Sequence, residues 1–108
     1  MLMSTTDVLQ DVEIEEYLGV VTSEVVYGSN AIRDWFAGLR DVIGGRTGSY
    51  ERLFAKGHAK ALEELQQRAK RKGANAVIGI SANTGTINLD EHGVLLLISA
   101  TGTAIKLR

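Results

Sequence analysis

The sequence predicts an α+β fold, a two-layer subunit of order β-α-α-β-β with a three-stranded, mainly antiparallel sheet. Three observations support it: runs rich in β-branched residues at both ends of the chain, two stretches of helical period between them, and glycines without any proline at the boundaries. With 108 residues and 44% hydrophobic content, the chain has the size and composition of one soluble domain, spanning residues 1–108.

The first expected strand covers residues 12–27, which are rich in valine and tyrosine. A strand of that length would span about 50 Å, too long for so small a domain. Either Gly19 is therefore the position of a bend or bulge, or the second half of the segment pairs elsewhere. Residues 1–10 show no clear period and are expected to be ordered only in part.

Two helices are expected to follow this strand. A Gly-Ser-Asn turn at residues 28–30 stops the strand and offers N-cap side chains, and apolar residues then recur with helical spacing over residues 32–43. Glycines at 44–45 end this helix. A longer helix is expected over residues 49–72, with Gly73 as its C′ residue; at about 1.5 Å per residue it needs a neighbour along its length.

The last two expected strands cover residues 74–87 and 94–107, joined by a hairpin loop over residues 88–93. Apolar side chains in the final strand point to both faces, whereas an antiparallel sheet in a monomer needs only one apolar face. Two helices from one chain cover one face, so the other is expected to meet a second copy, a partner or an apolar ligand. Self-association is the preferred interpretation.

Charge and composition argue against several functional classes. Twelve Lys and Arg against 13 Asp and Glu leave a net charge of −1, too little basic excess for a general nucleic-acid-binding protein. The absence of cysteine excludes a disulfide framework, thiol catalysis and thiolate metal sites. The longest apolar run, residues 94–98, is too short to cross a membrane, and the N-terminus lacks a basic start, so a cytoplasmic location is expected.

Side chains that ligate metals are sparse. The weak candidates are His58, at the edge of the apolar stripe of the long helix, and Asp90, Glu91 and His92 in the hairpin loop. A histidine at the core margin and a solvated loop tip are the more common explanations, and no HxxxH, HExxH or EF-hand motif is present. A ring of identical subunits could still build a site from one residue per chain. The acidic cluster at residues 13–16 is interpreted as the solvated face of an edge strand.

The most distinctive segment is residues 33–51, in which the pair Arg-Asp recurs after seven residues. This spacing places two pairs in rows beside the apolar stripe: Arg33 with Arg40, and Asp34 with Asp41. The rows are interpreted as an ion-paired contact face between helices or subunits. The alternative treats residues 44–49, with Arg46, as an anion cradle at a helix start, although it lacks the lysine of a P-loop. No nucleophile elbow is present, so nothing in the sequence argues for an enzyme.

Three stretches carry a family resemblance: residues 17–22 (YLGVVT), 30–51 (NAIRDWFAGLRDVIGGRTGSYE) and 73–80 (GANAVIGI). They resemble the YbjQ-like proteins, small bacterial proteins of uncharacterised role that are often labelled heavy-metal-binding. The resemblance implies a β-α-β-β subunit related to the dodecins, assembled into a ring-shaped homo-oligomer, a pentamer or paired pentamers, without established catalytic residues. In one departure, residues 81–85 read Ser-Ala-Asn-Thr-Gly where the family usually has acidic residues, which weakens the metal label.

These observations predict a non-catalytic homo-oligomeric protein that binds a small ligand or a metal ion, such as a divalent cation, at subunit junctions. The residues expected to shape the contact or a pocket beside it are Arg33, Asp34, Arg40, Asp41, Arg46, Tyr50 and Glu51. Two alternatives stay open: a structural assembly protein without a ligand, and an enzyme whose site is completed between subunits.

Overall fold

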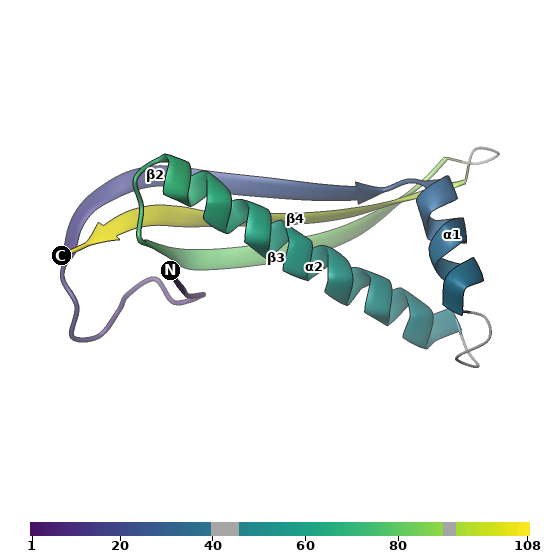
Figure 1. The fold of residues 1–108 in the computed structure, drawn as a ribbon, viewed down its shortest axis with the longest axis horizontal. Coiled ribbons are helices and arrows are strands. Elements are labelled where there is room, and N and C mark those ends of the chain that lie inside the picture. Colours follow the sequence, from purple (N-terminus) through teal and green to yellow (C-terminus); the bar gives the residue numbers. More distant parts are fainter. Residues whose placement is uncertain (40–45, 90–92) are drawn as a thin grey trace.

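A computed structural model of the chain describes residues 1–39, 46–89 and 93–108, with the backbone alone at 36–39 and 46–50. A four-stranded sheet of order β1-β3-β4-β2 lies against one long helix, and a shorter helix lies at one end of the molecule (Figure 1). The elements are β1 (Leu2–Met3), β2 (Ile14–Tyr27), α1 (Ser29–Leu39), α2 (Arg46–Arg71), β3 (Ala76–Asn88) and β4 (Val94–Leu107). The α+β class is confirmed.

The predicted count of three strands is wrong, because the N-terminal residues add a fourth strand. β1 pairs in parallel with β3, with Leu2 opposite Ala76. The chain then stays beside β3: the amide of Ser4 donates to the carbonyl of Val77 at 2.9 Å, and the amide of Gly79 donates to the carbonyl of Thr6 at 2.8 Å. A strand of two residues is held by backbone hydrogen bonds and leaves no period in the sequence from which to predict it.

β2 contains the predicted bulge at Gly19. Its φ is +104°, and the register with β4 shifts between Tyr17 and Gly19. A one-residue insertion sends the following side chains to the opposite face. Leu18, the extra residue at the bulge, and Val21 and Val25 after it therefore all pack into the same core, although their spacing is not a strict alternation.

The hairpin of β3 and β4 pairs from Asn88 opposite Val94, one residue beyond the predicted strand end. The amide of Leu89 donates to the carbonyl of Gly93 at 2.7 Å. Residues 90–92, the rest of the predicted loop, lie outside the described residues.

α1 is anchored at its start. The carbonyl of Gly28 accepts from the amide of Ile32 at 3.0 Å, and the helix begins at Ser29, within the turn at residues 28–30 that was predicted to cap it. The hydroxyl of Ser29 accepts from the amide of Val94 at 2.9 Å and donates to the carbonyl of Val94 at 3.1 Å. These bonds tie the helix to the first residue of β4. The predicted end of the helix, at residues 40–43, lies outside the described residues.

α2 begins three residues earlier than predicted, at Arg46. Its predicted C-terminus is confirmed: Gly73 has a φ of +90°, and the amide of Ala74 donates to the carbonyl of Ala69 at 3.1 Å, the pattern of a glycine-closed helix end. Among the described residues, no helix is long and apolar enough to cross a membrane.

The main core lies between α2 and the strands β2 and β4. The helix contributes a row of residues at every fourth position: Leu53, Gly57, Ala61, Leu65 and Ala69. Small residues in this row allow a close approach, and a Cβ on Gly57 would overlap the Cδ1 of Ile98 in β4. The long predicted helix therefore finds its neighbour within the chain, in the two strands beneath it.

The second face of the sheet is covered at one end by the chain itself. Leu9, from the segment between β1 and β2, packs on the buried side chains of Ile78 and Ile105. The expectation that only another molecule could cover this face is therefore wrong at that end. Towards the other end, apolar side chains stay uncovered, with Val26 56% and Ile87 48% exposed.

Candidate functional site

A pocket of about 360 Å³ lies between the two helices at the end of β2. Its lining comes from three elements: Tyr27 from β2, Ala31, Asp34 and Trp35 from α1, and Leu53 and Lys56 from α2. A small apolar cluster of Ile32, Leu53 and Leu96 holds α1 against α2 and β4 beside this pocket. The pocket walls are therefore set by packing of elements that lie far apart in the sequence.

The pocket combines an aromatic face with charged and polar groups. The Nζ of Lys56 lies 5.1 Å from the centroid of the Trp35 ring, within the range of a cation–π interaction. Asp34 is exposed and adds a carboxylate to the rim. The hydroxyl oxygen of Tyr27 is buried and has no hydrogen-bond partner within the described part of the chain. A buried hydroxyl without a partner is costly, and a ligand group or a water commonly satisfies it.

Of the predicted site residues, the structure brings Asp34 into this pocket. Arg33 is exposed, and its guanidinium donates to the Oδ1 of Asn30 at 2.7 Å, a contact within α1. Glu51 is exposed on α2 and does not line the pocket. Four further positions lie outside the described side chains, so their predicted roles stay predictions: Arg40, Asp41, Arg46 and Tyr50.

The predicted anion cradle at residues 44–49 is helical over most of its length, because α2 begins earlier than predicted. Residues 46–49 form the first turn of that helix, whereas residues 44 and 45 lie outside the described residues. The glycine at position 48 is thus helical rather than part of a loop that precedes the helix.

The metal candidates are not brought together by the described residues. His58 is half-buried on α2, and no group of three or more His, Cys, Asp or Glu side chains able to hold a metal ion is found in the described ranges. Asp90, Glu91 and His92 lie outside those ranges. The metal site stays a prediction.

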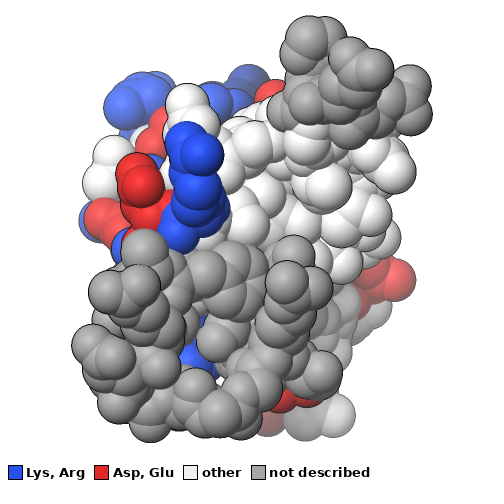
Figure 2. All heavy atoms as spheres, turned by 90° about the vertical axis from the view of Figure 1, so that its right-hand side faces the viewer, with Lys and Arg blue, Asp and Glu red and all other residues white. Residues whose placement is uncertain are grey.

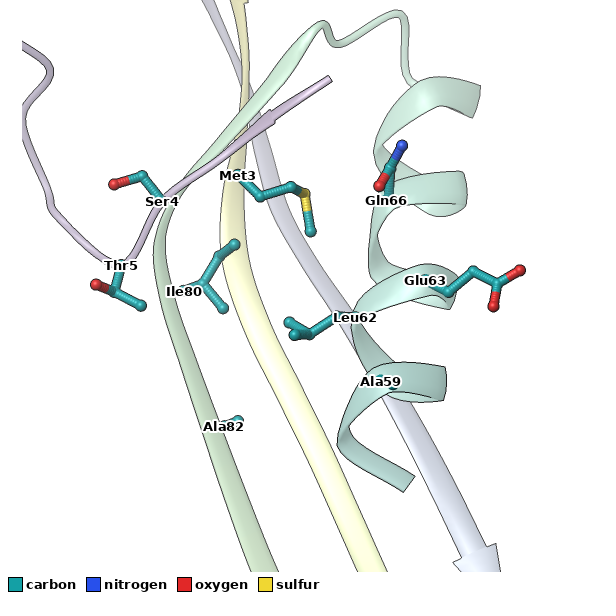
Figure 3. A pocket seen from close by; sticks show the side chains of 9 residues that line it. All are labelled: Met3, Ser4, Thr5, Ala59, Leu62, Glu63, Gln66, Ile80 and Ala82. Atoms are coloured by element: carbon teal, nitrogen blue, oxygen red, sulfur yellow. The ribbon is translucent and has the colours of Figure 1, made fainter. Parts of the chain in front are cut away.

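A second cavity, of about 520 Å³, lies between β3 and α2 (Figure 3). The side chains of Met3, Leu62 and Ile80 lie around the groove, whereas the Glu63 carboxylate points away from it (Figure 3). Its interior therefore presents apolar groups and no convergent polar group for chemistry. The sequence does not indicate this cavity, because Met3 belongs to the N-terminal segment, which shows no period.

Tyr27 and Lys56 were not predicted as site residues. Tyr27 ends the predicted strand over residues 12–27, Lys56 lies within the predicted helix over residues 49–72, and neither belongs to a motif. The one signal available was Trp35, the single tryptophan of the chain, because a tryptophan next to charged residues on a surface helix is a common feature of binding sites.

Comparisons with known proteins agree with this fold over the full length. A UPF0145 protein from Nostoc punctiforme is 70% identical over 108 residues, covering 100% of both chains, and one from Synechocystis is 64% identical over 105 residues, covering 97% of both. A crystal structure of a protein of unknown function from Pediococcus pentosaceus, assigned to the DUF74 family, superposes with a TM-score of 0.62. It covers 100% of this chain and 98% of that one at 18% identity, which shows the shared fold.

The family model that matches this chain spans residues 1–108 and carries the description "Putative heavy-metal-binding". That label describes the family as a whole, and the two relatives from Nostoc punctiforme and Synechocystis are named UPF0145 proteins. The resemblance in residues 17–22, 30–51 and 73–80 thus extends to every part of the chain. With a match over its whole length and relatives at 64% to 70% identity, the chain belongs to the YbjQ family of UPF0145 proteins.

Proposed function

We propose that the protein is a non-catalytic, homo-oligomeric binding protein that holds a small planar ligand with an anionic group in the pocket between α1 and α2. The observation that carries the proposal is the Lys56 ammonium 5.1 Å from the Trp35 ring in a pocket of about 360 Å³. That volume falls within the range of about 300–1,000 Å³ typical of small-molecule sites.

Each pocket residue supports one feature of the ligand. The Trp35 ring offers a face on which a flat, apolar ring system stacks. Lys56 supplies a cation for a carboxylate, phosphate or sulfonate group. A polar atom that reaches Tyr27 would satisfy its buried hydroxyl, which has no partner among the described residues.

Self-association is supported by the uncovered apolar side chains at the hairpin end of the second sheet face, among them Val26 and Ile87. Apolar surface of this kind commonly marks an interface between subunits. A pentameric ring or a pair of such rings, in the cytoplasm, is the assembly that the family resemblance favours. Three residues that line the pocket belong to α1. This helix lies at one end of the molecule (Figure 1), which is a position that a neighbouring copy could border.

The ligand proposal is tested with 1-anilinonaphthalene-8-sulfonate, a planar anionic probe. Because Trp35 is the only tryptophan, energy transfer from it to the probe reports binding close to this pocket. We expect Lys56→Met to raise the probe concentration at half-saturation of that signal at least tenfold. Lys60→Met, at an exposed position on the same helix, is expected to leave that concentration unchanged. Equal affinities of the wild type and Lys56→Met would overturn the proposed role of the pocket.

A metal-ion ligand is the second candidate, supported by the family description alone. Elemental analysis of protein purified without chelator decides between the two. A stoichiometric metal per subunit or per ring favours the metal, whereas its absence together with probe binding favours the planar ligand. An oligomer that holds neither supports the scaffold alternative.

A further inference from the structure

The groove between β3 and α2 (Figure 3) is a second cavity of ligand size. Its volume of about 520 Å³ lies within the range of about 300–1,000 Å³ typical of small-molecule sites. The groove exists because α2 packs mainly over β2 and β4, where Ala61 and Leu65 are buried. Leu62, beside them on the helix, instead lines the groove and is 36% exposed.

The wall of the groove formed by β3 and the N-terminal segment is held in place by the fold. The amide of Ser4 donates to the carbonyl of Val77 at 2.9 Å, and the amide of Ile80 donates to the carbonyl of Ser4 at 3.1 Å. The side chains of Met3 and Ile80 pack against the main core. The groove is therefore formed before any ligand arrives, which lowers the entropic cost of binding.

The shape and the apolar lining of the groove suit a chain rather than a ring. Gln66 lies at the same end as Met3, and Ala59 lies at the other (Figure 3). The positions between these two helix residues cover about 10 Å along the axis. The apolar side chains that line the groove are all aliphatic: Met3, Ala59, Leu62, Ile80 and Ala82. Among the described residues that line it, none offers an aromatic face for stacking.

The groove is also poor in charge. β3 contains no charged residue. Seen from the end at which α1 lies, the charged side chains gather mainly to one side of the molecule, and a broad area without charge occupies the other (Figure 2). Of the described residues that line the groove, none is basic, and the carboxylate of Glu63 points away from it (Figure 3). A charged group placed in the groove would lose water without gaining a counter-ion.

One polar group remains for a ligand. The hydroxyl groups of Ser4 and Thr5 point away from the groove (Figure 3), and the Ser4 hydroxyl is hydrogen-bonded to that of Thr6 at 2.7 Å. The side chain of Gln66 is half-buried, and its amide forms no hydrogen bond with the described parts of the chain. An amide is uncharged and can both donate and accept a hydrogen bond.

We propose that this groove binds a single aliphatic chain that ends in an uncharged polar group, as in a fatty alcohol. The chain displaces water from Met3, Leu62 and Ile80, and the flexible thioether of Met3 adapts to its shape. The polar end forms a hydrogen bond with the amide of Gln66. An alkyl carboxylate of the same length is disfavoured, because its charge finds no cation among the described residues that line the groove.

This site differs from the pocket of the proposed function in both position and chemistry. That pocket presents Trp35 and Lys56 to a planar anion, whereas the groove presents aliphatic side chains and an amide. The proposal therefore stands whether or not the pocket between the helices holds a ligand. A second copy of the chain is the competing occupant of the groove, and it is an outcome of the test.

Binding is read from the methionine methyl groups by nuclear magnetic resonance. The chain contains two methionines, Met1 and Met3, of which Met3 lines the groove. We expect hexanol, octanol and decanol to shift the Met3 methyl signal and to leave that of Met1 unchanged. Because a buried methylene raises affinity about fourfold, each lengthening by two methylenes should tighten binding at least fivefold. Decanoate should bind at least tenfold more weakly than decanol.

Two pairs of variants locate the ligand in the groove. Leu62→Ser shortens the apolar wall and is expected to weaken decanol binding at least tenfold, whereas Lys60→Ser, exposed on the same helix, should leave it unchanged. Gln66→Lys supplies a cation at the polar end and is expected to reverse the preference, so that decanoate binds more tightly than decanol. Gln67→Lys, exposed at the next position, should keep the preference of the wild type.

Several results would overturn the proposal. One is a Met3 signal that does not respond to saturating decanol. Another is equal decanol affinity of Leu62→Ser and Lys60→Ser, or a reversed preference in Gln67→Lys as well. A Met3 signal that shifts on dilution but not with decanol would assign the groove to a second copy. Lys56→Met should leave decanol binding unchanged, and a joint loss of decanol and of the planar anionic probe would contradict a separate site.

Discussion

At the scale of single residues, the contact between helix and sheet depends on small side chains. Ser23, on β2, is fully buried, and its hydroxyl donates to the carbonyl of Ala61 on α2 at 2.7 Å. A larger residue at either position would separate the two elements, since protein interiors are packed without spare room. This hydrogen bond therefore contributes to both the spacing and the alignment of α2 on the sheet.

Replacing Ser23 with alanine is expected to lower the free energy of unfolding by about 1 kcal/mol, the net contribution of a typical hydrogen bond. The cost stays small because the Ala61 carbonyl also belongs to the helix ladder and is not left without a donor. Urea unfolding at one fixed protein concentration measures the effect, since self-association would otherwise shift the midpoint. Thr101→Ala, at an exposed strand position, is the control, and equal midpoints for Ser23→Ala and wild type would contradict the assignment.

At the scale of elements, α2 packs over β2 and β4 and leaves most of β3 uncovered. In its buried row, Ala61 and Leu65 pack in one cluster with Val25 on β2 and Ile98 on β4. Leu53 of the same row packs in a second cluster with Leu96 on β4. One consequence is that Arg68 on α2 reaches the outer edge of β2, where it donates to the carbonyl of Thr22. The helix thus covers that edge of the sheet at this point.

We expect Arg68→Met to lower the free energy of unfolding by about 1 kcal/mol, because it removes the bond to the Thr22 carbonyl and keeps the apolar stem. The side chain is 43% exposed, so solvent screening limits the size of the effect. The variant also uncovers the β2 edge, and light scattering is expected to show larger species than for the wild type. Glu64→Gln removes the ion pair but leaves the hydrogen bond from Arg68 to the Thr22 carbonyl, so it should change the free energy of unfolding by a few tenths of a kcal/mol. If Glu64→Gln also formed larger species, loss of the bond between Arg68 and Thr22 would not be the cause of their formation.

At the scale of the whole molecule, the N-terminal segment completes the core that the helices leave open. Leu9 is half-buried against Ile78 and Ile105 on the face of the sheet opposite α2. The molecule measures 49 × 27 × 19 Å, and this cover is confined to one end of its long axis. Towards the other end, apolar side chains such as Val26 and Ile87 stay exposed.

Leu9→Ala is expected to destabilise the fold by about 2 kcal/mol, the lower end for truncation of a leucine, since this side chain is only half-buried. Val8, its neighbour, is 75% exposed, so Val8→Ala should stay within about 0.5 kcal/mol of wild type. Thermal and urea unfolding measure both variants. Equal effects of the two would mean that the segment does not form a specific cover.

The sequence predicted the helices and strands well where the spacing of apolar residues reflects which side of the element is buried. The helical spacing around Ile32 and Leu65, the bulge at Gly19 and the helix end at Gly73 are all found in the structure. The pocket was predicted only through Asp34, because Tyr27 and Lys56 carry no motif and come together only when β2, α1 and α2 pack around it. The pairing of Leu2–Met3 with β3 was also not predicted, because two residues are too few to show a period.

By itself, the sequence determined the α+β class, the order of the main elements and the family, since each depends on local periodicity or on runs of identical residues. Only the tertiary structure decided which sheet face the N-terminal segment covers, which side chains line the pocket, and which strand edge Arg68 covers. The physical reason is that these features depend on contacts between residues distant along the chain, such as Leu9 with Ile105 or Arg68 with Thr22. Their geometry is set by packing and backbone hydrogen bonds, which no local pattern records.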